Sequence, residues 1–290
     1  MCNVVLVTEN MVRLPCRNRD SHKGDYGKLF IVAGSEGYTG APVFAAQGAL
    51  RSGAGLVYLG VPREVYPIVA ARCSSEMPFP LPEQLDQVVE RARGCDVVLA
   101  GPGMGRSPWA KQLIWRLVTE VDGPLVLDAD GLNALEGRTE VLHGRKALTV
   151  LTPHDGEFAR LAGYSLPPHH RLEQARQLAQ DTGSVVVLKG HETLTVDPSG
   201  QVWRNTSGNP GMAKGGSGDI LAGMIASFLG QKQLLEVASC PAELVAWAVY
   251  CHGAAGDAAA RQWGEYGMLP DDTLRAIGGV LHAQTEEGKR

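Results

Sequence analysis

The chain has 290 residues, 44% of them hydrophobic, and its 27 basic and 31 acidic side chains give a formal net charge of -4. This length suits one α/β unit with a large core, so we expect a single domain over residues 1–290 in which residues 1–20 form an N-terminal extension. The acidic balance argues against nucleic acid as the main partner, and the lack of a membrane-length apolar run or an apolar leader indicates a cytoplasmic protein with no membrane partner.

Short apolar runs alternate with helical segments along the chain. Strands are predicted at residues 29–32, 56–61, 96–100, 125–130, 147–151 and 185–188, and a hairpin at 193–203. Helices are predicted at residues 42–51, 62–72, 83–93, 108–120, 156–162, 172–181, 220–229, 241–263 and 271–283. This alternation predicts an α/β fold with a mostly parallel central sheet and helices on both faces.

Ligands of such sheets bind at the carboxyl ends of the strands. The unusual loops of this chain collect there, at residues 34–40, 101–105, 128–133, 152–155, 189–193 and 208–219. The six cysteines show neither a C-x-x-C pair nor metal-ligand spacing. We therefore predict reduced, buried thiols and assign no metal ligand among the side chains.

The loop 208–219 is the strongest of these signals. Gly215, Gly216 and Gly218 let backbone N–H groups converge on one point, and Ser217 is a favourable N-cap for the helix that follows. Unpaired amides at a helix N-terminus form an anion site that a phosphate can approach closely. Asp219 stands in this first turn, either as a carboxylate favoured by the helix dipole or as a base that takes a proton from a hydroxyl attacking the phosphate.

Several polar residues leave two interpretations open. Lys189 follows four apolar strand residues and suits a phosphate partner better than a solvated face. The loop 101–105 is equally consistent with a functional site and with a tight strand exit. Asp128 and Asp130 are equally consistent with function and with helix caps.

Two histidines also have structural explanations. His154, judged alone, is best explained as a core histidine that is hydrogen-bonded to the backbone. His252 and Asp257 lie on an otherwise apolar helix, where they line a nucleotide pocket or satisfy each other. We favour the second explanation for this pair.

Taken together, the loops closely resemble the ADP-dependent NAD(P)H-hydrate dehydratases over about residues 20–280. The resemblance rests on His22-Lys23-Gly24-Asp25-Tyr26-Gly27, Gly37-Tyr38-Thr39-Gly40-Ala41-Pro42, Gly101-Pro102-Gly103-Met104-Gly105, Leu127-Asp128-Ala129-Asp130-Gly131-Leu132-Asn133, Leu151-Thr152-Pro153-His154, Leu188-Lys189-Gly190 and the loop 209–219. That family has a ribokinase-like fold. Many bacterial members carry an N-terminal epimerase domain, and because only about twenty residues precede His22 here, we expect the dehydratase domain alone.

The resemblance implies an enzyme that restores NADH and NADPH whose nicotinamide ring has been hydrated (NADHX and NADPHX). The family dehydrates the S form, using ADP in bacteria and ATP in eukaryotes, and with ADP it releases AMP and phosphate. Asp219 would be the catalytic base and would also contact the substrate, together with Ala41, Gly103, Gly105 and His154. The nucleotide would be held by Lys189, Gly190, His191, Glu192, Thr193, Gly215, Gly216, Ser217 and Gly218.

The resemblance further implies Mg²⁺ beside ADP, a homo-oligomer such as a tetramer, and a separate NAD(P)H-hydrate epimerase as a partner. Two other functions stay open. A small-molecule kinase of the same fold, of the hydroxymethylpyrimidine or thiazole type, would share the glycine loop, the base and Mg²⁺ but would release a stable phosphorylated product. A non-catalytic nucleotide-binding regulator would not need Asp219. The ADP-versus-ATP and NADHX-versus-NADPHX preferences are left open as well.

Overall fold

The computed structural model describes residues 4–164 and 170–285. Its centre is a ten-stranded sheet in the order β1-β10-β9-β8-β7-β6-β5-β2-β3-β4. The two pairs that involve β9 are antiparallel and the other pairs are parallel. The strands are β1 (Val4–Val7), β2 (Lys28–Val32), β3 (Leu56–Val61), β4 (Met77–Pro80), β5 (Val97–Ala100), β6 (Leu125–Leu127), β7 (Thr149–Leu151), β8 (Val185–Leu188), β9 (Leu194–Val196) and β10 (Val202–Asn205).

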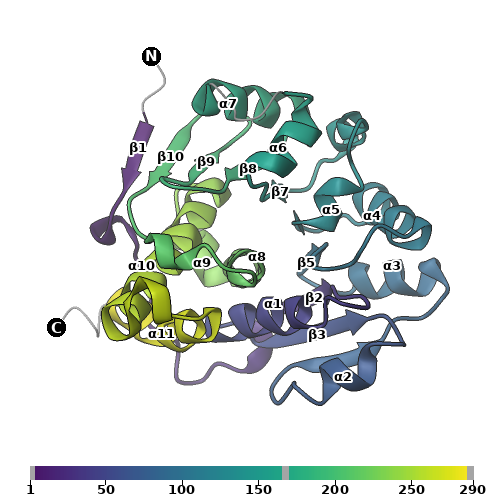
Figure 1. Ribbon diagram of the computed structural model, residues 1–290, viewed down its shortest axis with the longest axis horizontal. Helices are drawn as coiled ribbons and strands as arrows, with labels where there is room; N and C mark the ends of the chain where they lie inside the picture. Colours follow the sequence, from purple (N-terminus) through teal and green to yellow (C-terminus); the bar gives the residue numbers. More distant parts are fainter. Residues whose placement is uncertain (1–3, 165–169, 286–290) are drawn as a thin grey trace.

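Helices cover both faces of this sheet, and the sheet curves around α8 (Figure 1). The helices are α1 (Gly40–Arg51), α2 (Tyr66–Ala70), α3 (Leu85–Arg93), α4 (Pro108–Glu120), α5 (Asp130–Asn133), α6 (Asp155–Ala162), α7 (Arg171–Thr182), α8 (Ser217–Gly230), α9 (Lys232–Val237), α10 (Pro241–Gly267) and α11 (Pro270–Ala283). One apolar core joins α1, α8, α10 and α11 to the sheet, and a second joins α3, α4, α6 and α7 to its other face. The predicted α/β fold with a mostly parallel sheet is therefore confirmed.

Two helices of the inner layer approach each other closely because glycines stand at their contact. A Cβ at Gly223 of α8 would lie 2.0 Å from the carbonyl oxygen of Ala45 in α1, and a Cβ at Gly48 of α1 would lie 2.5 Å from the carbonyl oxygen of Ile220. Only glycine allows the two backbones to come this near. This contact fixes the start of α8, and with it the glycine loop, against α1.

Strand β1 and the short helices α5 and α9 were not predicted, and three further differences have a local cause. The helix predicted at 62–72 is shorter, because Pro67 lacks an N–H and fits only the first turn of α2, which begins at Tyr66. The strand predicted at 125–130 ends at Leu127, because Ala129 has a φ of 49°, outside the β region. The structure adds β4, whose two prolines are tolerated because it is the edge strand of the sheet.

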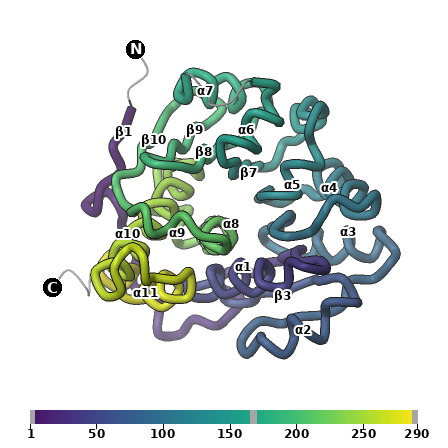
Figure 2. Tube along the Cα trace, in the orientation of Figure 1, coloured from purple at the N-terminus to yellow at the C-terminus, as the bar shows by residue number. Residues whose placement is uncertain are grey.

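The ends of the described chain lie on the same side of the molecule. Figure 2 shows the purple segment that starts with β1 beside the yellow helices α10 and α11. The unpredicted strand β1 pairs with β10, and the N–H of Leu14 donates to the carbonyl of Gln284 just after α11. Among the residues described, no helix is long and apolar enough to cross a membrane.

Candidate active site

The chemistry-bearing side chains meet where β6 and β8 end and α8 begins. Lys189, directly after β8, places its Nζ 2.6 Å from Oδ1 of Asp128, which follows β6. The same Nζ lies 3.8 Å from Oε2 of Glu157 in the first turn of α6. Thr152 donates a second hydrogen bond to the same Oδ1 of this buried carboxylate over 2.7 Å. In this structure the ammonium group of Lys189 therefore contacts carboxylates and does not lie on a solvated face.

Electrostatics tie Asp219 to this cluster. Burial lowers the pKa of Lys189, but the charges of Asp128, Glu157 and Asp219 outweigh it, so the pKa is raised. For Asp219, burial and then the charge of Asp128 raise the pKa from 3.8 to about 7, against the opposing effect of Lys189. A carboxyl group with a pKa near neutrality is suited to exchange a proton in catalysis.

The glycine loop begins α8 as predicted, but its cap is different. The N-cap is Gly216, whose φ of 103° is costly for other residues, and Ser217 is the first helical residue without a side-chain cap. Gly216 also faces the ring of Phe44, because a Cβ there would lie 2.8 Å from the ring. A Cβ at Gly215 would meet no atom within 4 Å, so this part of the loop faces open space.

Polar contacts hold the rest of the loop. The N–H of Gly208 and the side chain of Asn209 both donate to the carboxylate of Asp257, over 2.8 and 2.9 Å. Lys214 donates to backbone carbonyls, including that of Met268 at 2.6 Å, and so fastens the loop to the end of α10. The lysine within the loop is therefore structural, in contrast to Lys189.

The predicted mutual contact between His252 and Asp257 is wrong. Asp257 binds the loop backbone, whereas His252 is buried beside Lys189 and forms a hydrogen bond with the backbone of Ser217. Burial, and then the charge of Lys189, lower the pKa of His252 to about 4, so it is neutral. Its Nε2 has no hydrogen-bond partner among the described residues. His252 therefore contacts the first turn of α8 through its hydrogen bond with the backbone of Ser217.

The residues expected to contact the substrate form a second group next to α1. A Cβ at Gly103 would lie 3.0 Å from the Cβ of Ala41, and Ser35 donates to the carbonyl of Gly103 over 2.8 Å. The N–H of Gly105 donates to Oδ2 of Asp130 over 2.8 Å. Neither Asp130 nor Asp128 is a helix N-cap, since that position of α5 is Ala129.

His154 lies beside Lys189 but is not a core residue. Its side chain is 56% exposed, and its Nδ1 accepts the N–H of Gly156 over 2.9 Å, which makes it the N-cap of α6. Glu157 completes a capping box by accepting the N–H of His154 over 2.9 Å. The N–H of Lys189 donates to the carbonyl of Pro153 over 2.8 Å, which joins this cap to the end of β8.

The segment from Lys189 to Thr193 makes a tight turn between β8 and β9. Thr193 Oγ1 donates to the carbonyl of Gly190 over 2.9 Å, while His191 and Glu192 are exposed. Arg171 at the start of α7 donates to the carbonyl of Lys189 over 3.1 Å and pairs with Asp155 at 2.8 Å. The turn therefore presents its backbone and the His191 side chain to solvent beside the glycine loop.

Sequence reasoning missed the role of Glu157. The signal was the spacing from His154, since a carboxylate three residues after an N-cap is typical of a capping box. That spacing does not reveal the contact with Lys189, which requires β7 and β8 to be neighbours. The thiol expectation also needs correction. Cys251 is buried, but Cys16 is exposed and Cys73, Cys95 and Cys240 are half-buried; these five are free, and Cys2 lies outside the described residues.

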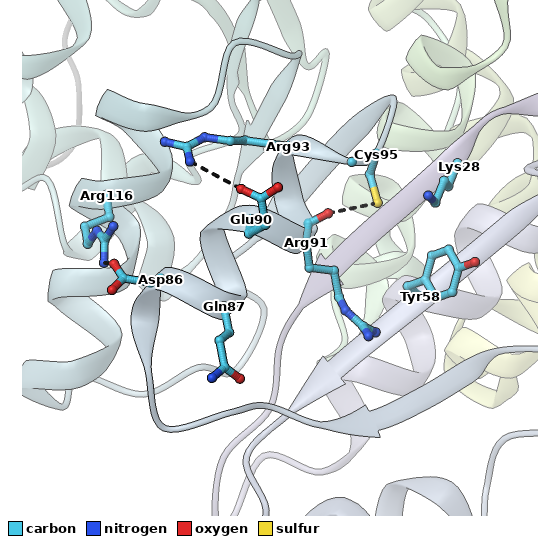
Figure 3. Close-up of a pocket in the computed structure, with 10 residues that line it drawn as sticks. Lys28, Tyr58, Asp86, Gln87, Glu90, Arg91, Arg93, Cys95 and Arg116 are labelled. Carbon is cyan, nitrogen blue, oxygen red and sulfur yellow. Dashed lines mark hydrogen bonds and ion pairs between the residues drawn. The ribbon is translucent and has the colours of Figure 1, made fainter.

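Two cavities lie on opposite edges of the sheet. One of about 770 Å³ is at the amino ends of β2 and β3, where Lys28 and Arg91 flank the ring of Tyr58 near Cys95 (Figure 3). Its other charges pair with one another, as in the 2.5 Å contact of Arg116 with Asp86. It is far from Asp219. The second, of about 610 Å³, shares Gly105 with the expected substrate loop.

No group of three or more His, Cys, Asp or Glu side chains within residues 4–164 and 170–285 is arranged to hold a metal ion by itself. Mg²⁺ is commonly bound by one or two carboxylates together with phosphate oxygens and water. The carboxylates of Asp128 and Glu157 fit that second mode, because together with Asp219 they carry more negative charge than Lys189 balances.

Comparison with known proteins now decides the family. The sequence model described as NAD(P)H-hydrate dehydratase matches residues 29–278. The chain belongs to the NAD(P)H-hydrate dehydratase family. A bifunctional NAD(P)H-hydrate repair enzyme Nnr from Moorella thermoacetica is 44% identical over 95% of this chain, which covers 53% of that protein. An ADP-dependent (S)-NAD(P)H-hydrate dehydratase from Neisseria meningitidis serogroup B is 38% identical over 83% of this chain and 80% of its own length.

Solved structures agree with this placement in the dehydratase family. An ADP/ATP-dependent NAD(P)H-hydrate dehydratase from Bacillus subtilis, co-crystallized with ATP/Mg²⁺, is 31% identical with a TM-score of 0.84, covering 97% of this chain and 99% of its own. A hydroxyethylthiazole kinase from Pyrococcus horikoshii, 15% identical with a TM-score of 0.60, shares the fold alone. A ribokinase-like superfamily protein from Enterococcus faecalis is 27% identical with a TM-score of 0.83, covering 98% of this chain and 97% of its own, so the predicted ribokinase-like fold is confirmed. The chain spans about half the length of the bifunctional relatives it matches.

Proposed function

We propose that this chain catalyses the ADP-dependent dehydration of the S form of hydrated NADH or NADPH, releasing NADH or NADPH, AMP and phosphate. The observation that carries the proposal is Asp219, whose pKa is raised to about 7 in the first turn behind the glycine loop, beside Lys189. A phosphate cradle alone does not need a carboxylate there, whereas phosphoryl transfer to a hydroxyl needs a group that accepts its proton.

The first step transfers the β-phosphoryl group of ADP to the C6 hydroxyl of the hydrated ring. Asp219 accepts the hydroxyl proton as the oxygen–phosphorus bond forms and the bond to AMP breaks. Amides of residues 215–218 cradle the phosphate, and Lys189 neutralises charge as it leaves Asp128 for the phosphate. The ordinary pKa of an Asp carboxyl is 3.8, so a value near 7 brings Asp219 closer to the proton affinity that a general base needs.

The second step expels phosphate from C6. Electrons from the ring nitrogen break the carbon–oxygen bond and phosphate leaves, and transfer of a C5 proton to water or to the expelled phosphate then restores the dihydronicotinamide without redox change. Ala41, Gly103, Gly105 and His154 would hold the substrate for this step, and residues 189–193 with Gly218 would hold the AMP part. Asp128 and Glu157 would hold Mg²⁺ with the phosphates, and the ion would supply charge neutralisation there.

Three further features belong to this proposal. The Bacillus subtilis relative, co-crystallized with ATP/Mg²⁺, supports a magnesium requirement. Trp263, Tyr266 and Leu269 expose large apolar surface around the end of α10, which supports a homo-oligomer such as a tetramer. The bifunctional relatives support cooperation with an epimerase, and we place the reaction in the cytoplasm with its nucleotide substrates.

The test is the absorbance of reduced nicotinamide with purified protein, hydrated NADH, Mg²⁺ and either ADP or ATP. We expect the band to grow with one phosphate released per NADH formed, and to stay flat for Asp219→Asn. A stable phosphorylated product without growth of the band would establish a kinase instead. No turnover with either nucleotide from folded, nucleotide-binding protein would favour a regulator.

A further inference from the structure

Apart from Gly105, the residues that line the cavity of about 610 Å³ have no role in the reaction described above. Its walls are the segments that follow β2, β3, β4 and β5, namely residues 34–36, 62–64, 81–83 and 104–107, with Trp109 of α4. We call it the β3–β4 cavity. Its volume lies in the range of roughly 300–1,000 Å³ that is typical of small-molecule sites.

The β3–β4 cavity continues the row of sites along the carboxyl edge of the sheet. Gly105 and Ser35 line it, and both also hold the loop that carries Gly103, since Ser35 donates to the Gly103 carbonyl. In the strand order β6-β5-β2-β3, β3 lies three strands from β6, which bears Asp128. At about 4.8 Å per strand this separation is roughly 14 Å. A dinucleotide with its reactive ring near Asp219 can reach this distance with its other nucleoside.

The floor of the cavity is apolar and includes an oriented aromatic ring. Leu81 and Met104 are buried there, and Trp109 is half-buried at the edge of the cavity. The indole Nε1 of Trp109 donates to the carbonyl of Glu83 over 3.0 Å, which fixes the ring. A held indole ring beside apolar side chains suits stacking with a purine base.

The rim of the cavity carries charges of both signs. Arg106 is 64% exposed and lies 3.7 Å from Oδ1 of Asp130, beside the loop at Gly105. It stands at the junction between the β3–β4 cavity and the reaction centre, where a pyrophosphate would pass. The carboxylates of Glu36, Glu64 and Glu83 are exposed around the opening and can accept hydrogen bonds from ribose hydroxyls and an adenine amino group.

We propose that the β3–β4 cavity binds the adenosine half of the hydrated dinucleotide, with the adenine stacked on Trp109 and the pyrophosphate beside Arg106. This inference rests on the proposed function, because the reactive ring must lie at Asp219. The other source of adenosine in the reaction is ADP, and the experiment separates the two. If the cavity instead took the adenosine of ADP, the KM for ADP would respond to changes at Trp109.

The experiment compares hydrated NADH with hydrated reduced nicotinamide mononucleotide, which lacks the adenylate half. For Trp109→Leu, and less strongly for Trp109→Phe, we expect the KM for hydrated NADH to rise roughly tenfold or more. The KM for the mononucleotide and for ADP should not change. Trp115→Leu is the matched control, because Trp115 lies on the same helix and donates its Nε1 to the Ala134 carbonyl over 2.9 Å but does not line the cavity.

The inference would be overturned if the KM rose equally for both hydrated substrates, if only the KM for ADP rose, or if no KM changed. Calorimetric titration with NADH and with reduced nicotinamide mononucleotide repeats the comparison without turnover. Wild-type protein that turns over neither substrate but binds NADH through Trp109 would refute the proposed reaction and keep the assignment of the cavity. If the wild type turns over hydrated NADH but the Trp109 variants leave the ratio of the two hydrated-substrate KM values unchanged, the proposed reaction stands and the assignment of the cavity is refuted.

Discussion

Replacing Asp219 by Asn removes a carboxyl group whose ionisation the fold disfavours. Burial, and then the charges of Asp128 and Glu157, raise its pKa from 3.8 to about 7, against the attraction of Lys189. Because the pKa of Asp219 is higher in the folded than in the unfolded protein, its contribution to the free energy of unfolding is fully present below about pH 4. That contribution is lost as the pH rises to about 7. The shift corresponds to at most about 4 kcal/mol, since Asp219 is partly exposed and solvent screens its charge.

We therefore expect Asp219→Asn to be more stable than the wild type at pH 8, with a smaller difference at pH 5. One kcal/mol corresponds to about 2–4 °C in Tm for chains somewhat shorter than this one, so the gain at pH 8 is several degrees. Thermal melts by circular dichroism without nucleotide or Mg²⁺ measure it. Asp130→Asn is the control and should gain no stability, because the carboxylate of Asp130 accepts hydrogen bonds from Gly105 and Asn133 in the folded protein.

The same variant should lose turnover by roughly 10² or more, the scale of a lost general base, while it still binds ADP. In the wild type, kcat/KM should rise through about pH 7 as Asp219 ionises in the free enzyme. A variant that is no more stable at pH 8 than at pH 5, relative to the wild type, would refute the electrostatic account. Near-normal turnover would remove the role of Asp219 as base.

Three further outcomes follow from single contacts. Asp128→Asn should lower the pKa of Asp219 by removing a like charge, so the rise of kcat/KM in a pH profile should move to lower pH. Gly215→Ala should keep its Tm, since a Cβ there meets no atom within 4 Å, but should weaken ADP binding roughly tenfold in calorimetry by obstructing amide contacts with phosphate. In urea melts the free energy of unfolding of Gly223→Ala should fall by about 1–3 kcal/mol or more, because its Cβ would lie 2.0 Å from a carbonyl of α1. The control, Gly278→Ala on the exposed face of α11, should gain about 0.5–1 kcal/mol of unfolding free energy.

Elements with local signals could be predicted to the residue. Helix α4 spans Pro108–Glu120 as expected, because Ser107 caps it and Pro108 suits its first position. Strand β8 is continuously apolar and ends where Lys189 begins. The strand β4 escaped prediction because its two prolines are compatible with a strand only at the edge of a sheet, and the edge is known only when the strand order is known.

The candidate site likewise contains residues that the sequence itself places together and residues that only the tertiary fold brings together. The glycine loop and Asp219 are consecutive in the sequence, so their proximity needed no tertiary information. The contact of Lys189 with Asp128 joins segments 61 residues apart and depends on the strand order around β6, β7 and β8. The expected pairing of His252 with Asp257 failed for a local reason, because residues five apart on a helix do not face each other.

The charge balance at Lys189 bears on the choice between an enzyme and a passive nucleotide-binding protein. Asp128, Glu157 and Asp219 together exceed the one positive charge of Lys189, so an incoming phosphate meets net repulsion unless a cation accompanies it. A regulator selected for binding alone would gain affinity by losing Asp219. In an enzyme that transfers a phosphoryl group Asp219 is instead an advantage, because its uptake of a proton removes one negative charge as the transferred group becomes more anionic. Asp219→Asn should therefore bind ADP at least as tightly as the wild type, although it is inactive, and weaker binding would contradict this account.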